Sequence, residues 1–244
     1  WHAQDARVYG VMSALTPLAF YLLIRTLERD DNGQFRRWLP YIFVQTVALY
    51  IYYLEPFWML AQGLYVLSLW RVDVLKRLLR AWVVIGVLIL PVLAQLYTLL
   101  FVSEYQGNAE SSDFSLLLTW FTPTLFFGEN RIPAWVGGIV VLVIIGVLVL
   151  LWQRDRRSAS LLALWIFIPI MGLYGASFFS SFFRPRYVMT IIPALVLLIP
   201  AVALLLPAKQ RLLRVGVVVM LMVGISGAEV TNYFVNDPPK APDW

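Results

Sequence analysis

Residues 135–152 read WVGGIVVLVIIGVLVLLW, a stretch without one charged side chain. A run of this length and composition is typical of a helix that crosses a hydrocarbon layer about 30 Å thick. Similar runs recur along the 244 residues, of which 61% are hydrophobic and only 14% are charged. Soluble domains are roughly one half apolar and one quarter charged. We therefore expect an all-α, polytopic transmembrane helix bundle.

Eight apolar segments are predicted as crossings. They are residues 9–27, 38–53, 57–70, 81–101, 135–152, 161–179, 188–206 and 215–227. The apolar stretch from 39 to 70 is too long for one span and slightly short for two, and the charge pattern favours two short helices joined at residues 52–56. We expect a transmembrane domain over residues 1–227, followed by an outer-side linker at residues 228–244.

Most of the 19 Lys and Arg residues fall in four alternate loops between these segments. Basic residues are retained on the cytoplasmic side, so those loops are predicted to be cytoplasmic, in a multi-pass protein of the cytoplasmic (plasma) membrane. The longest outward loop, residues 103–133, turns apolar and aromatic at 114–127, which predicts a helix lying in the membrane interface. The net charge of +5 is spread over several loops, which indicates membrane orientation and no nucleic-acid partner.

The residue types present exclude several kinds of site. Without cysteine there can be no disulfide scaffold or thiolate metal site, and His2 is the single histidine, which argues against a Ser-His-Asp triad or a multi-histidine metal site. The chain starts at Trp1 without an initiator methionine and stops at Trp244 in a predicted loop. We expect it to be an internal part of a longer polypeptide.

The first candidate site stands at the outer end of the first crossing, where Asp5, Arg7 and Tyr9 fall within one turn of one another. A carboxylate beside an arginine can hold a divalent cation or a phosphate, or orient a hydroxyl group, and Asp5 is the candidate metal ligand. The alternative is an interfacial ion pair that only anchors the end of a helix.

The second candidate is Arg184 with Arg186 and Tyr187, at the outer start of the seventh crossing. Outward arginines oppose the positive-inside bias and therefore need a reason. Guanidinium groups pair bidentately with phosphate, so a lipid-linked phosphate is a natural ligand. Equally open is the interpretation that both arginines only reach ordinary phospholipid headgroups.

Glu55 is the one charged residue in the apolar stretch from 39 to 70. A carboxylate inside a membrane is a functional hypothesis, and Glu55 is a candidate cavity residue together with Tyr52. Because Glu55 precedes Pro56 at a predicted turn, we favour a water-exposed turn carboxylate.

Five short motifs occur in a characteristic order along the chain. They are WHAQDARVY at 1–9, ALYIYY at 48–53, LAQGLY at 60–65, Arg186-Tyr187 followed by IPAL at 192–195, and KAPDW at 240–244. In this order they resemble bacterial polytopic glycosyltransferases of the GT-C class, in particular the family 39 or dolichyl-phosphate-mannose-protein mannosyltransferase-like group. Two departures are Asp5, where the family usually has Glu, and Tyr52, where it usually has His.

The resemblance implies an enzyme that transfers a sugar from a polyprenyl-phosphate donor to a glycan, lipid or protein acceptor on the outer face of the cytoplasmic membrane. Arg184 and Arg186 would bind the leaving lipid phosphate. Asp5, held by Arg7, would bind the acceptor or a divalent cation. The catalytic aspartate of the class would precede Trp1, so we expect this segment to be inactive alone.

Two other classes of protein stay open at the level of sequence. A transporter or flippase of a lipid-linked saccharide would also need outward arginines and a groove within the membrane. A non-catalytic membrane scaffold would need neither Asp5 nor Arg186 for activity.

Overall fold

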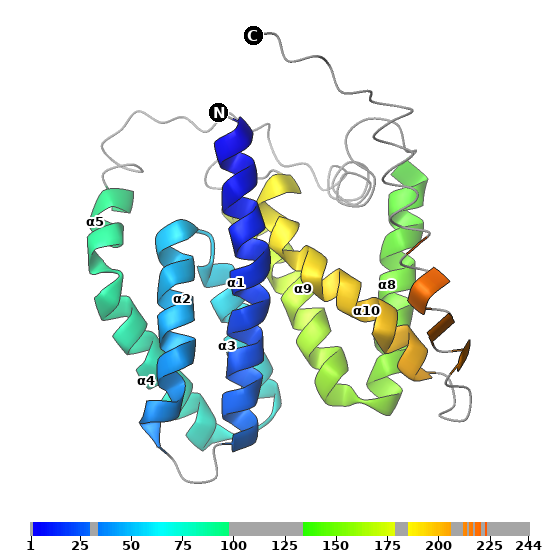
Figure 1. The fold of residues 1–244 in the computed structure, drawn as a ribbon, viewed down its shortest axis with the longest axis horizontal. Helices are drawn as coiled ribbons and strands as arrows, with labels where there is room; N and C mark the ends of the chain where they lie inside the picture. The colour runs from blue at the N-terminus through cyan, green and yellow to red at the C-terminus, as the bar shows by residue number, and fades with distance from the viewer. Residues whose placement is uncertain are drawn as a thin grey trace. The chain divides into compact units, whose positions relative to one another are not determined.

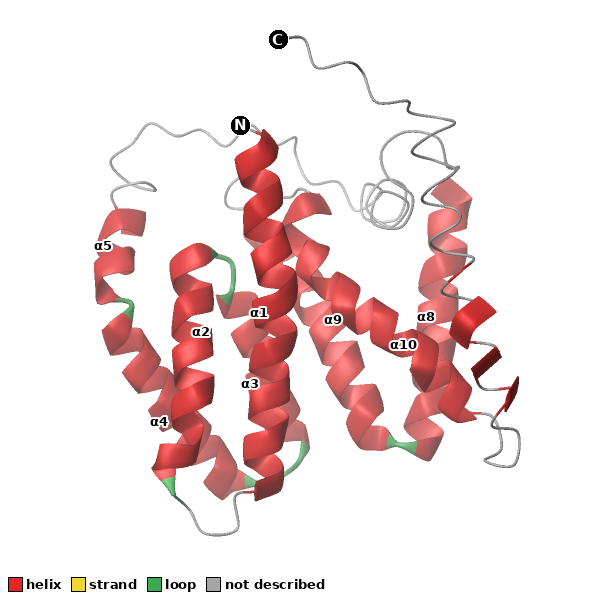
Figure 2. Ribbon diagram, in the orientation of Figure 1, coloured by secondary structure: helices red, strands yellow, loops and turns green. Residues whose placement is uncertain are grey.

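The computed structural model describes residues 2–29, 34–97, 134–178 and 185–205, together with 212–213, 215–216, 218–220 and 223. Within these ranges the chain forms helices and turns and no strand (Figure 1; Figure 2). The predicted all-α class is therefore confirmed. The predicted interfacial helix at 114–127, most of the eighth crossing and the linker at 228–244 lie outside the described residues.

Ten helical elements follow one another among the described residues. They are α1 (His2–Arg29), η1 (Phe35–Trp38), α2 (Leu39–Ile51), α3 (Pro56–Ser68), α4 (Val72–Leu88), α5 (Leu90–Tyr97), α8 (Ala134–Arg154), α9 (Arg156–Ala176), η4 (Pro185–Ile191) and α10 (Ile192–Leu205). Two segments, Gly10–Glu28 within α1 and Arg156–Ala176, are long and apolar enough to cross a membrane. The number of eight crossings stays a prediction.

The apolar stretch from 39 to 70 forms two helices, α2 and α3, as the charge pattern predicted. Proline lies in the first turn of each helix, where its missing N–H leaves no helical hydrogen bond unmade. Residues 52–55 form the turn between the helices. We call this turn the α2–α3 hairpin turn.

The basic segment at 71–80 was predicted as a loop, and this prediction is wrong. Helix α4 begins at Val72 and runs to Leu88. Its buried residues are Val74, Leu78, Ala81 and Ile85. Their spacing of three or four places them on one face, so the basic residues between them lie on the exposed side of a helix.

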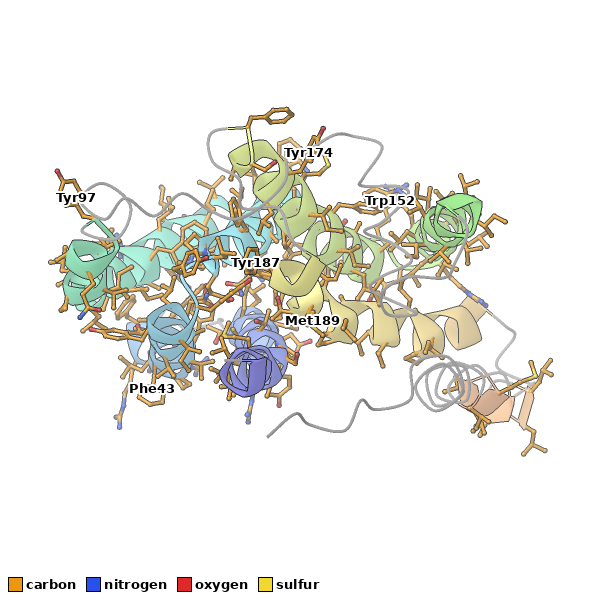
Figure 3. The ribbon with its side chains drawn as sticks, turned by 90° about the horizontal axis from the view of Figure 1, so that it is seen from above. Phe43, Tyr97, Trp152, Tyr174, Tyr187 and Met189 are labelled. Atoms are coloured by element: carbon orange, nitrogen blue, oxygen red, sulfur yellow. The ribbon has the colours of Figure 1, made fainter. Side chains whose placement is uncertain are left out.

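The described chain divides into two compact units. The first contains Trp1–Ser112 and Ala163–Ala194, and the second contains Asp113–Leu162 and Leu195–Trp244. The core of the first unit is rich in aromatic side chains: Phe20 of α1 stacks on Trp165 of α9 with ring centroids 4.1 Å apart. Large apolar side chains are also exposed, among them Phe43, whose position at the edge of α2 is visible in Figure 3.

Candidate functional site

The α2–α3 hairpin turn holds Tyr52 and Glu55 together through the main chain. Tyr52 ends α2 in an extended conformation, and its N–H donates to the carbonyl of Ala48 over 2.8 Å. The N–H of Glu55 in turn donates to the carbonyl of Tyr52 over 3.1 Å. The position of the Tyr52 side chain is therefore coupled to that of Glu55.

Glu55 is fully buried, so the prediction of a water-exposed turn carboxylate is wrong. One carboxylate oxygen, Oε1, accepts a hydrogen bond from Nε2 of Gln45 over 2.9 Å. The other, Oε2, accepts from Oγ1 of Thr16 on α1 over 3.5 Å. The burial of Glu55 removes its carboxyl group from water. This desolvation raises the pKa of Glu55 to about 8, and the bonds from Gln45 and Thr16 oppose the increase.

A chain of buried polar side chains continues from Glu55 into the unit. Gln62 donates to Oε1 of Gln45 over 3.4 Å, and the hydroxyl of Tyr41 donates to Oε1 of Gln62 over 2.6 Å. The indole N–H of Trp82 donates to the Tyr41 hydroxyl over 3.0 Å. The chain links four helices, from α1 to α4. This polar chain was not predicted from the sequence, although glutamines inside apolar helices are a signal for it, because buried polar groups need partners.

Tyr52 connects the hairpin turn to η4. Its hydroxyl donates to the backbone carbonyl of Tyr187 over 2.5 Å, across 135 positions of sequence. The Tyr52 side chain is only 3% exposed. Helix α1 also contacts η4, and Figure 3, in which Tyr187 is labelled, shows η4 beside α1. Three of the predicted site residues, Tyr52, Glu55 and Tyr187, thus lie in one region of the first unit.

The predicted residues Asp5, Arg7 and Tyr9 belong to the first turns of α1. At 1.5 Å per residue, Asp5 stands about 16 Å along the axis from Thr16, which marks the level of the hairpin turn. Figure 1 shows the start of α1 extending beyond that turn. Their side chains, that of Arg186 and the whole of Arg184 lie outside the described residues. A shared cavity of Asp5 and Arg186 therefore stays a prediction.

Predicted cytoplasmic segments meet at the other end of α1. Nη1 of Arg71 donates to the carbonyl of Leu27 over 3.2 Å, and Oγ1 of Thr26 donates to the carbonyl of Arg37 over 3.4 Å. Leu27 lies about 16 Å along the helix from Thr16. The basic segments therefore lie at one end of α1, and the hairpin turn and η4 lie farther along α1, at about the level of Thr16.

The polar oxygen atoms around the hairpin turn belong to isolated acids, amides and hydroxyl groups. In the described part of the chain no three Asp, Glu, His or Cys residues gather in a group that could hold a metal ion. The metal prediction for Asp5 lies outside the described side chains. Two buried polar atoms, Nε1 of Trp58 and Oγ1 of Thr190, have no hydrogen-bond partner among the described residues. Buried groups of this kind can bind a polar group of a ligand or water.

Comparison with protein-family models, with curated proteins and with solved structures gave no match to this chain. The likeness to glycosyltransferases therefore rests on the motifs quoted from the sequence. The geometry adds a hairpin turn with a buried acid, bonded to the segment that carries Arg186 and Tyr187.

Proposed function

We propose that this chain is the membrane part of a glycosyltransferase that moves a sugar from a polyprenyl-phosphate-linked donor to an acceptor on the outer face of the cytoplasmic membrane. The observation that carries the proposal is the bond from Tyr52 to the Tyr187 carbonyl. It joins two of the family-like motifs, which are 135 positions apart in sequence, at the level of Thr16 on α1 and away from the basic segments.

The membrane setting is supported by the length and the surface of the helices. Helix α1 has 28 residues and is about 42 Å long, more than the roughly 30 Å of a hydrocarbon core. Side chains such as Val83 on α4 and Leu142 on α8 are 67% and 68% exposed, as lipid contact would require. Trp70 is 90% exposed beside the basic segment of α4, a position typical of tryptophan at a membrane surface.

The proposed orientation follows from the places of the basic segments and of the hairpin turn along α1. The end with Arg37 and Arg71 faces the cytoplasm, because positive residues are retained there. The hairpin turn and η4 then lie on the outer side of those basic segments. In this orientation Arg186 is an outward arginine, in a segment that the Tyr52 hydroxyl bonds to the buried turn.

The proposed reaction forms a bond between an acceptor hydroxyl oxygen and the anomeric carbon of the sugar. The bond from that carbon to the phosphate oxygen breaks, and the polyprenyl phosphate leaves with the electron pair. A carboxylate base takes the hydroxyl proton. Arg186, assisted by Arg184, stabilises the phosphate as its negative charge increases, and Asp5 with Arg7 binds the acceptor or a divalent cation.

The test is sugar transfer by the full-length protein in proteoliposomes that contain a polyprenyl-phosphate sugar donor. Arg186→Ala should lower turnover by about 10²-fold, the scale of removing one electrostatic donor from a transition state. The turnover of Arg186→Lys should lie between that of wild type and that of Arg186→Ala, because lysine keeps the charge and loses the planar fork. Arg36→Ala, which changes an exposed residue in a basic segment, is the matched control and should transfer like wild type.

Full transfer activity in Arg186→Ala would reduce that residue to a headgroup anchor and contradict the proposal. Movement of a lipid-linked saccharide across the bilayer by wild type, without any sugar transfer, would favour the flippase instead.

A further inference from the structure

The position of Tyr52 is fixed by contacts other than the one with η4. Its N–H is bonded to Ala48 and its carbonyl accepts from Glu55, whose own side chain is bonded to α1 and α2. The ring lies 6.0 Å from that of Trp58 between centroids. The phenol therefore projects from a turn that is fastened to three helices.

The group that Tyr52 holds is the main-chain carbonyl of Tyr187, one residue after Arg186 in η4. That carbonyl belongs to the planar peptide that follows Tyr187, and the Cα atom of Arg186 lies about 3.8 Å from the Cα atom of Tyr187. A bond to the carbonyl of Tyr187 therefore restricts where the main chain of Arg186 can lie. Arg186 is also preceded by Pro185 at the start of η4, and proline restricts the backbone further.

The contact also explains why a tyrosine stands in this buried turn. A phenol that is 3% exposed loses its hydrogen bonds to water, so it needs an acceptor in the protein. The Tyr187 carbonyl is that acceptor. A phenylalanine would keep the ring but leave the carbonyl without this donor, so the hydroxyl group serves the link to η4.

We propose that Tyr52 is a positioning residue for phosphate recognition: its hydroxyl fixes the Tyr187 carbonyl and thereby holds Arg186 where it meets the lipid phosphate. This inference rests on the proposed function, in which Arg186 binds that phosphate. The ligand that Arg186 would recognise is a phosphate monoester or diester on a lipid, and we infer that this lipid is the polyprenyl phosphate.

The experiment measures binding to the full-length protein in detergent micelles. The probes are polyprenyl monophosphate, the unphosphorylated polyprenol as a blank, and phosphatidylglycerol as an ordinary headgroup. Tyr52→Phe should bind polyprenyl phosphate between about two- and tenfold more weakly than wild type, the scale of one neutral hydrogen bond. Binding of phosphatidylglycerol should not change.

Tyr50→Phe is the matched control. The hydroxyl of Tyr50 also donates to a backbone carbonyl, that of Leu88, over 2.9 Å, but this contact lies on α4 and not on η4. Tyr50→Phe should therefore bind polyprenyl phosphate like wild type. Thermal unfolding of both variants and amide hydrogen exchange of the η4 peptide accompany the binding measurement, with faster exchange expected only for Tyr52→Phe.

A double-mutant cycle separates positioning from a general structural effect. If Tyr52 acts through Arg186, then Tyr52→Phe should weaken binding by less than about twofold when Arg186→Ala is already present, because interacting residues are not additive. If Tyr52→Phe weakened polyprenyl-phosphate binding equally with Arg186 and with Ala at that position, the inference would be overturned. It would also be overturned if Tyr52→Phe bound like wild type while Arg186→Ala bound weakly. Absence of polyprenyl-phosphate binding by wild type itself would instead overturn the proposed function, and the inference with it.

Discussion

Replacing Glu55 with glutamine should remove a pH dependence of stability that the buried carboxyl group creates. The unfolded chain loses this proton near the ordinary value of 4.5, and the folded protein loses it only near a pKa of about 8. Between these values the folded state binds more protons, so stability decreases as the pH rises. A pKa raised from 4.5 to about 8 corresponds to a loss of about 5 kcal/mol on complete ionisation.

Glutamine has nearly the same shape and keeps an acceptor for Gln45 and a polar group for Thr16, but it has no proton to lose. The melting temperature of the detergent-solubilised protein, measured across the window from about pH 4.5 to pH 8, should fall for wild type and stay nearly constant for Glu55→Gln. The variant should therefore be the more stable protein at the alkaline end. Glu28→Gln changes an exposed acid on α1 and should follow the wild-type curve. Parallel curves for wild type and Glu55→Gln would refute the reasoning.

Two other predictions concern packing and orientation. A Cβ atom at Gly63 would lie 2.5 Å from Cη2 of Trp82, and the Trp82 ring cannot turn away without losing its bond to Tyr41. Gly63→Ala should therefore destabilise by about 1–3 kcal/mol in thermal unfolding, whereas Gly86→Ala, with open space around the new methyl group, should be neutral or stabilising. Because the chain has no cysteine, Tyr53→Cys and Gln34→Cys can be labelled singly. A membrane-impermeant thiol reagent outside intact cells should modify the first and not the second, and the reverse result would invert the proposed orientation.

The sequence was a good guide to the helices and a poor one to the burial of Glu55. Hydrophobic run lengths and the alternation of basic loops predicted the division of residues 39–70 into two helices, since both signals are local. The same charge pattern predicted a loop at 71–80, where the structure has the start of α4. Basic residues report the side of the membrane and carry no information on backbone conformation, and lysine and arginine are good helix formers.

The contacts that define the site come from residues far apart in the chain, and this is why they could not be predicted. Thr16 and Glu55 are 39 positions apart, and Tyr52 and Tyr187 are 135 apart. Tyr52 was identified as a candidate cavity residue beside Glu55 and from a family motif, and neither signal names the Tyr187 carbonyl as its partner. Gln45 and Gln62 could have been noticed as polar residues in apolar helices, but their link to Glu55 required the helix packing.

The buried polar chain fixes a single position of α1 along its own axis in the first unit, which apolar packing alone does not fix. An apolar helix surface can slide past its neighbour by one turn, about 5.4 Å, with little change in buried area. Such a slide would separate Thr16 from Glu55 and leave the buried acid with one donor fewer, which costs more than the bond itself contributes. The burial of Glu55 therefore lowers stability at a pH above its pKa. It also fixes the position of α1 along its axis, and with it the stretch that carries Asp5 and Arg7, relative to the hairpin turn that holds η4.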